Sequence, residues 1–114
     1  MDAGDPHIHA ELDVVRAGAA VRNVVAATFG LAGDLPGVVA TGCGIRVPYA
    51  MTSPRPESVT CLPCREHARR QHLRTAEEVE RLGSMPGSTL TTGQARLVAD
   101  RHRGLATRFS TTDD

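Results

Sequence analysis

The sequence predicts a small α+β protein in which a zinc-binding β-hairpin and helix lie between an N-terminal and a C-terminal helix. Three observations predict this fold class: a length of 114 residues, apolar residues at helical spacing near both ends, and three cysteines in the middle. The cysteines stand in a glycine turn, Thr41-Gly42-Cys43-Gly44, and in a close pair, Cys61-Leu62-Pro63-Cys64. A chain of this length builds one modest core, which a bound metal would help to stabilise.

The composition limits the classes of partner and the compartment. With 13 basic residues, all of them arginine, and 13 acidic residues, the net charge of zero argues against a general polyanion binder. No apolar run reaches the length of a membrane span, about 18 residues or more. The acidic start, Met1 to Asp5, is not followed by an apolar segment, so no targeting signal is expected. An odd number of cysteines does not suit a secreted disulfide framework, so we expect a cytoplasmic protein.

The N-terminal part divides into a polar segment, residues 1–10, and an amphipathic helix, residues 11–30. Asp5 or Asp13 is placed to cap this helix, and Gly30 to end it. We expect the helix to pack over the metal module, in preference to forming a dimer seam. Its apolar residues recur at helical spacing: Val14, Val21, Val25 and Phe29.

Residues 31–83 form the predicted zinc-binding module, of ββα or treble-clef-like type. Residues 38–40 and 45–49 flank the Cys43 turn as the two strands of a hairpin. A charged helix over residues 63–82 follows the cysteine pair and ends at Gly83.

Residues 84–114 comprise a linker, a C-terminal helix from about Thr92 to Phe109, and a disordered tail. Aromatic residues are scarce, with no Trp, one Tyr and two Phe, so the core must be built from Val, Ala and Leu. We expect four apolar residues of the C-terminal helix to share one side: Leu97, Val98, Leu105 and Phe109.

The three cysteines predict a structural Zn²⁺ site. Zinc takes four ligands in a tetrahedron, and a Cys-x-x-Cys turn points both sulfurs at one centre. The exposed N–H groups of the following helix favour the thiolate forms of Cys61 and Cys64. Cys43, between two glycines, lies where the backbone can bend around a metal.

A histidine is the natural fourth ligand, and spacing leaves two candidates open. His67 lies one helical turn after Cys64, on the same face of the helix. His9 lies upstream and could fold back, and His7 could take its place. His72, two turns beyond Cys64, is the poorer choice. We expect at most one of His9 and His67 to bind the metal.

Two segments, Thr41-Gly42-Cys43-Gly44-Ile45-Arg46-Val47-Pro48 and Val59-Thr60-Cys61-Leu62-Pro63-Cys64-Arg65, resemble a group of small zinc-finger-like proteins common in actinobacteria and their phages. Members of that group carry a Cys-Gly turn, a loop and a Val-Thr-Cys-x-x-Cys helix start, with a histidine upstream of the first cysteine. The resemblance implies metal ligation by Cys43, Cys61 and Cys64 and favours His9 as the fourth ligand. It covers residues 38–70 and implies no activity, since most members have no assigned function.

Two other chemistries compete with a structural zinc site. The Cys61–Cys64 pair has the Cys-x-Pro-Cys form of thioredoxin-like proteins, so a thiol redox protein or sensor is the alternative. The long buried strand and βαβ pattern of that fold are missing. An iron–sulfur cluster normally takes four cysteines, and this chain has three. Three thiolates weaken the Lewis acidity of a metal and no carboxylate is placed as a base, so we expect a non-catalytic protein.

The helix after the cysteine pair carries the residues best placed to contact phosphate groups of a nucleic acid. Zero net charge and the lack of aromatic stacking residues favour a protein partner over DNA. We therefore predict a small regulatory zinc protein that supports protein interaction, with the oligomeric state open. The nucleic-acid candidates are Arg65, Arg69, Arg70 and Arg74.

Overall fold

The structure is a computed structural model that describes residues 6–18 and 37–110. Its combination of an antiparallel hairpin with helices confirms the predicted α+β class. Within the predicted helix over residues 11–30, residues 14–18 are helical, and residues 19–30 lie outside the described part, as do residues 1–5 and 111–114 of the predicted terminal segments. The other elements are β1 (Val38–Ala40), β2 (Arg46–Pro48), the 3-10 helices η2 (Tyr49–Met51) and η3 (Pro56–Ser58), α2 (Leu62–Gly83) and α3 (Thr92–Ser110).

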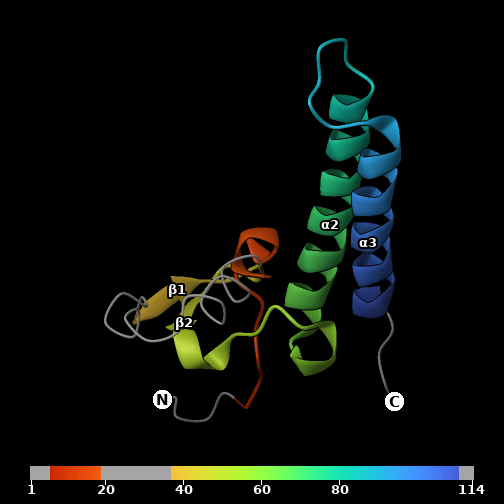
Figure 1. The fold of residues 1–114 in the computed structure, drawn as a ribbon. Coiled ribbons are helices and arrows are strands. Elements are labelled where there is room, and N and C mark those ends of the chain that lie inside the picture. The colour runs from red at the N-terminus through yellow and green to blue at the C-terminus, as the bar shows by residue number, and fades with distance from the viewer. Residues whose placement is uncertain (1–5, 19–36, 111–114) are drawn as a thin grey trace, which may run out of the picture.

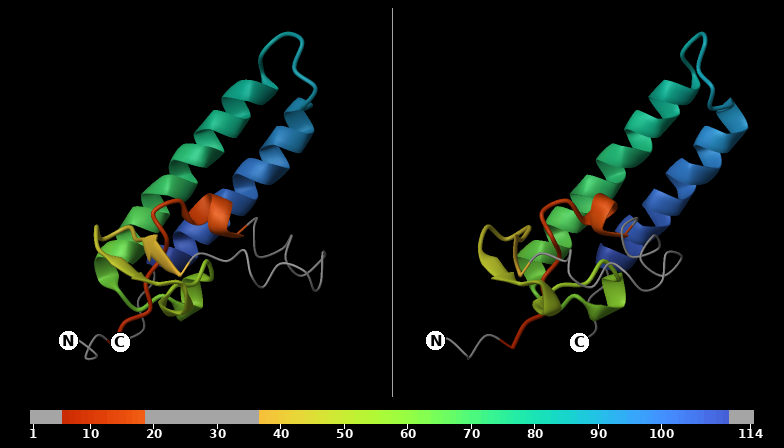
Figure 2. Two further views of the ribbon diagram at one scale, coloured as in Figure 1. Left: turned by 90° about the vertical axis from the view of Figure 1, so that its left-hand side faces the viewer. Right: turned by 60° about the vertical axis from the view of Figure 1, so that its left-hand side comes forward.

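The described elements form a base, which contains β1, β2, η2 and η3, and an arm, which is the pair of helices α2 and α3 (Figure 1). Figure 1 shows α2 and α3 side by side as a long antiparallel pair, joined by a loop at their far end. The hairpin of β1 and β2 lies beside the first turns of α2, and both views in Figure 2 show the arm projecting away from it. None of the helices in the described part of the chain has the length and apolar character to cross a membrane.

Small residues line the seam between α2 and α3. A Cβ atom added to Gly83 would lie 2.4 Å from the Cβ atom of Ala95, so the two helix backbones approach closely at this point. The predicted apolar side of the C-terminal helix is wrong in one respect, because Leu97 is 73% exposed. Close packing of helices selects the smallest side chains for the contact line, and here these are alanines: Ala68, Ala76, Ala95, Ala99 and Ala106.

Local capping fixes the start of two helices. The N–H of Gln94 donates to Thr91 Oγ1 and the N–H of Thr91 donates to Gln94 Oε1, both at 3.0 Å, which is a reciprocal capping box before α3. Asp13 Oδ1 accepts the N–H of Arg16 at 3.0 Å, so Asp13 caps the N-terminal helix, as one of the two predicted candidates.

The hairpin turn carries Cys43 at its tip. Val39 pairs with Val47 in the antiparallel register, and both side chains are buried. Thr41 closes the turn, because its N–H donates to Ile45 O at 2.9 Å and its hydroxyl donates to the same oxygen at 2.7 Å. Gly44 has φ of +98°, a conformation that favours glycine, and this residue lets the chain reverse immediately after Cys43.

Candidate metal centre

One histidine and three cysteines converge at the base of the arm. The candidate ligand atoms of His9, Cys43, Cys61 and Cys64 all lie within 4.8 Å of one another. Cys64 is fully buried and His9 is 3% exposed, while Cys43 is half-buried. These four groups could hold a metal ion.

His9 is positioned by a thread, residues 8–12, which runs between the two segments that carry the cysteines. The N–H of His9 donates to Met51 O at 2.9 Å, and its carbonyl accepts the N–H of Ser53 at 3.0 Å. On one side of His9, Ile8 O accepts the N–H groups of Thr60 and Cys61. On the other side, Ala10 O accepts the N–H of Gly42 at 2.9 Å. The thread therefore places the imidazole by backbone bonds to both cysteine-bearing regions.

Cys43 and Cys61 each accept a backbone N–H at sulfur. Burial raises the pKa of Cys43, but bonds from the Thr41 hydroxyl, the Ile45 N–H and the neighbouring thiols outweigh burial and lower that pKa to about 7. Burial raises the pKa of Cys61 to about 12, with the N–H of Cys64 opposing this and the nearby thiols adding to it. The negative charge of one thiolate opposes ionisation of the next thiol. A bound divalent cation would reverse this effect, because its positive charge favours the thiolate forms.

The distances at His9 match those of a tetrahedral site. The Nδ1 atom lies 3.5 Å from Cys43 Sγ and 3.5 Å from Cys64 Sγ. For Zn–N and Zn–S bonds of about 2.0 and 2.3 Å at a tetrahedral angle, the two ligand atoms stand about 3.5 Å apart. Nδ1 is therefore the His9 nitrogen that faces these two sulfurs.

His67, the other predicted candidate, lies outside this group of four residues. Its Nε2 atom is 2.7 Å from Leu12 O, and its ring packs against Gly42. A Cβ atom added to Gly42 would lie 2.8 Å from the His67 ring, so Gly42 makes room for that ring beneath the Cys43 turn. Gln71 Nε2 donates to the same Leu12 oxygen at 3.2 Å. His67 therefore supports the thread from the second turn of α2.

The remaining histidines lie away from the four-residue group. His7 Nδ1 is 3.4 Å from Thr60 Oγ1 at the surface. His72 is buried in the α2–α3 seam, where its Nδ1 atom lies 2.8 Å from Nδ1 of His102 and its ring stacks on Phe109. Burial, and then the neighbouring His102, lower the pKa of His72 from 6.5 to about 4.

The four predicted phosphate contacts have different surroundings. Arg65 is buried and bonds three main-chain carbonyls. Arg69 forms a two-point ion pair with Glu66, with the Nη2–Oε2 distance at 2.7 Å, and Arg70 Nη1 lies 3.9 Å from the same carboxylate. Arg74 is exposed.

Two features of this region were missed by the sequence reasoning: the carbonyl contacts of Arg65 and the His72–His102 pair. From the sequence alone, an arginine next to Cys64 could equally be an exposed charge or a buried side chain. His72 lies four residues from both Ala68 and Ala76, on one face of the helix, and this spacing is the signal that could have placed His72 in the seam.

Comparison with known proteins gave no match, either among protein families, among curated proteins or among solved structures.

Proposed function

We propose that this protein is a non-catalytic zinc protein whose metal site stabilises the fold and supports interaction with a protein partner in a regulatory role. One observation carries the proposal: His9 and the three cysteines together offer four ligand atoms in one cluster. Structural zinc sites have four protein ligands, whereas catalytic sites keep one position for water or substrate. Three soft sulfurs with one imidazole favour zinc over hard cations such as Mg²⁺ or Ca²⁺.

The position of the ligands supports a stabilising role for the metal. They come from the thread, the hairpin turn and the start of α2, which are far apart in the sequence. An ion at this point would join all three segments, and its binding free energy would become folding free energy. The resemblance to small zinc-finger-like proteins implies the same ligand set and stays a prediction.

Chelation tests the stabilising role. Removal of metal from the reduced protein should abolish most of the helical circular dichroism signal, and one equivalent of Zn²⁺ should restore it with release of protons from the thiols. A thiol redox protein, the alternative function, would stay folded without metal and form a reversible Cys61–Cys64 disulfide. That outcome would overturn the proposal.

The exposed side chains of the arm support a protein partner in preference to DNA. Three large apolar side chains are exposed toward its free end, Leu82, Met85 and Leu97, and exposed apolar groups mark protein contacts more often than nucleic-acid contacts. Of the four candidate arginines, Arg65 is buried and Arg69 is paired with Glu66.

A photo-crosslinking residue in place of Leu97 tests the partner class in cells, with the exposed Thr107 on the same helix as the matched control position. Discrete protein adducts at position 97 and not at position 107 are expected. Adducts to nucleic acid would contradict the proposal.

A further inference from the structure

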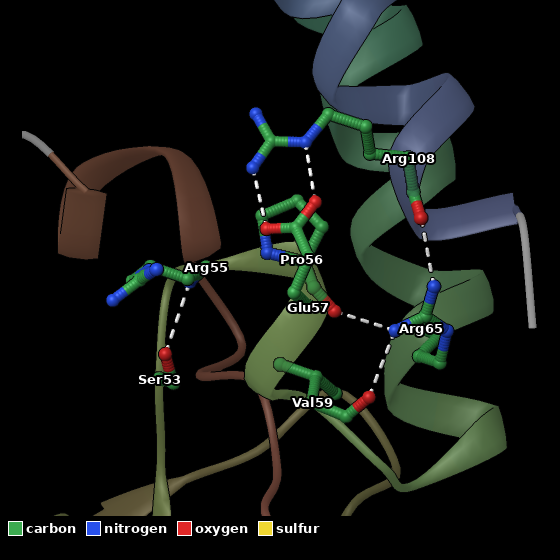
Figure 3. Close-up of polar contacts among 7 residues, drawn as sticks. All are labelled: Ser53, Arg55, Pro56, Glu57, Val59, Arg65 and Arg108. Atoms are coloured by element: carbon green, nitrogen blue, oxygen red, sulfur yellow. Dashed lines mark hydrogen bonds and ion pairs between the residues drawn. The ribbon is translucent and has the colours of Figure 1, made fainter. Parts of the chain in front are cut away.

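Arg65 joins the metal-binding base to the last turn of α3. The residue follows Cys64 directly, and its guanidinium is buried. Its Nη1 atom donates to Pro56 O at 2.5 Å and to Val59 O at 2.8 Å, while its Nη2 atom donates to Arg108 O at 2.7 Å (Figure 3). One side chain therefore bonds both the segment that leads into Cys61 and the last turn of α3.

Phe109, the residue after Arg108, brings α3 into contact with the same region. Its side chain is 1% exposed and belongs to the buried cluster that contains Cys61 and Cys64. The Arg65 guanidinium carbon lies 5.7 Å from the centre of the Phe109 ring. The end of α3 thus shelters the sulfur pair although α3 contributes none of the four ligands.

A third link between α3 and the base is exposed. The Arg108 side chain pairs with Glu57 through two bonds, at 2.6 Å from Nε and 2.5 Å from Nη2 (Figure 3). Both side chains are about half exposed to solvent. Exposed pairs of this kind contribute little, so Arg108 serves as a matched control whose carbonyl still accepts from Arg65 when the side chain is changed.

We propose that Arg65 and Phe109 couple the metal site to the docking of α3, so that α3 sets the affinity for zinc without supplying a ligand. The inference rests on the proposed structural zinc site. Bound metal fixes Cys61 and Cys64, and with them the first turn of α2, which holds the Arg65 guanidinium against its three carbonyls. Coupling is reciprocal. The factor by which loss of α3 docking lowers zinc affinity therefore equals the factor by which loss of zinc weakens α3 docking.

The test is the zinc dissociation constant of the full-length protein, measured by competition with a chromophoric chelator. Arg65→Met and Phe109→Leu should each weaken zinc binding about 10-fold or more while one zinc per chain still binds. The double variant should lose less than the product of the two single effects, because both substitutions break the same linkage. Arg108→Met should leave the affinity within about twofold.

Hydrogen exchange separates coupling from a general loss of stability. In zinc-loaded Arg65→Met, amides in the last turns of α3 should exchange faster than in the wild type, while those of β1 and β2 stay protected. Where Arg65→Met does not fold, Arg65→Lys, which keeps the charge and loses the planar fork, and Phe109→Leu decide the question. Bound zinc with unchanged affinity in these variants would overturn the coupling alone. A wild-type protein that binds no zinc would overturn the proposed function, and the coupling with it.

Discussion

His9 and Cys64 are 55 residues apart in the chain, and their Nδ1 and Sγ atoms lie 3.5 Å apart in the fold. The contact depends on the thread of residues 8–12, whose main chain bonds the loop at residues 51–53, the segment at residues 60–61 and the hairpin turn. The thread thereby brings a histidine of the polar N-terminal segment into a buried site whose other residues come much later in the sequence.

The two candidate histidines should differ sharply in their effect on metal binding. His9→Ala removes one of four ligands and should weaken zinc binding by about 100-fold or more, beyond the usual loss for an outer-shell group. His67→Ala removes a hydrogen bond to Leu12 O and should lower the free energy of unfolding by about 1–2 kcal/mol, with one zinc still bound. Zinc titration and urea unfolding check both variants, with the exposed His7→Ala as control. Equal zinc affinity in His9→Ala and the wild type would contradict the assignment.

Stability should fall in mild acid because of His72. Its pKa in the folded protein is about 4, against 6.5 in the unfolded chain, so the unfolded state binds more protons between these values. The contribution of neutral His72 to the free energy of unfolding is complete above pH 6.5. It is lost as the pH falls toward 4, and the loss amounts to about 3 kcal/mol.

Acid also releases metal from thiolate and imidazole ligands, so the effect of His72 must be isolated by comparison. Urea unfolding at pH 7 and pH 5 should show a shallower pH dependence in His72→Gln than in the wild type. His7→Gln, changed at an exposed position, should behave like the wild type. Identical pH dependence in all three proteins would show that His72 does not titrate as described.

Helical glycines should respond to substitution in opposite directions. Gly83→Ala places a methyl group 2.4 Å from Ala95 Cβ and should destabilise the protein by about 1–3 kcal/mol. Gly104→Ala, in the same helix pair but with nothing within 4 Å of the added carbon, should stabilise it by about 0.5–1 kcal/mol through helix propensity. Thermal unfolding of the zinc-loaded proteins measures both changes. A stabilising Gly83→Ala would mean that the α2–α3 seam is looser than the structure shows.

The protein should show no strongly salt-dependent affinity for duplex DNA. Arg65 donates to carbonyl oxygens and Arg69 to Glu66, so few of the candidate guanidinium groups are left for phosphate. Fluorescence anisotropy with a random duplex at low and moderate salt measures this directly. Tight binding that weakens steeply with salt and is reduced in Arg74→Gln would revive DNA as a partner.

The sequence was sufficient to predict the α+β class, the hairpin and the extents of the two long helices. Their signals are local: β-branched residues on either side of a Gly-Cys-Gly turn, a charged helical segment that ends at Gly83, and apolar residues at helical spacing after the linker. The choice between His9 and His67 was not local. It depended on the path of residues 8–12, which is set by main-chain bonds and by side chains far away in the sequence, such as His67 and Gln71.

The helix seam could not be predicted from hydrophobicity either. Leu97 is more apolar than Ala95 or Ala99, yet it faces solvent because the close approach at Gly83 leaves room only for small side chains. In the same way, Arg65 resembles its neighbours Arg69 and Arg70 in the sequence, and only the fold shows that three carbonyls surround it.

The measurement that most directly tests the central claim is X-ray absorption spectroscopy at the zinc edge of protein purified without chelator. A His9/Cys43/Cys61/Cys64 site predicts three sulfur neighbours at about 2.3 Å and one nitrogen at about 2.0 Å, with the nitrogen lost or replaced by water oxygen in His9→Ala. A first shell with fewer than three sulfurs, a nitrogen that persists in His9→Ala, or protein purified without zinc would contradict the account.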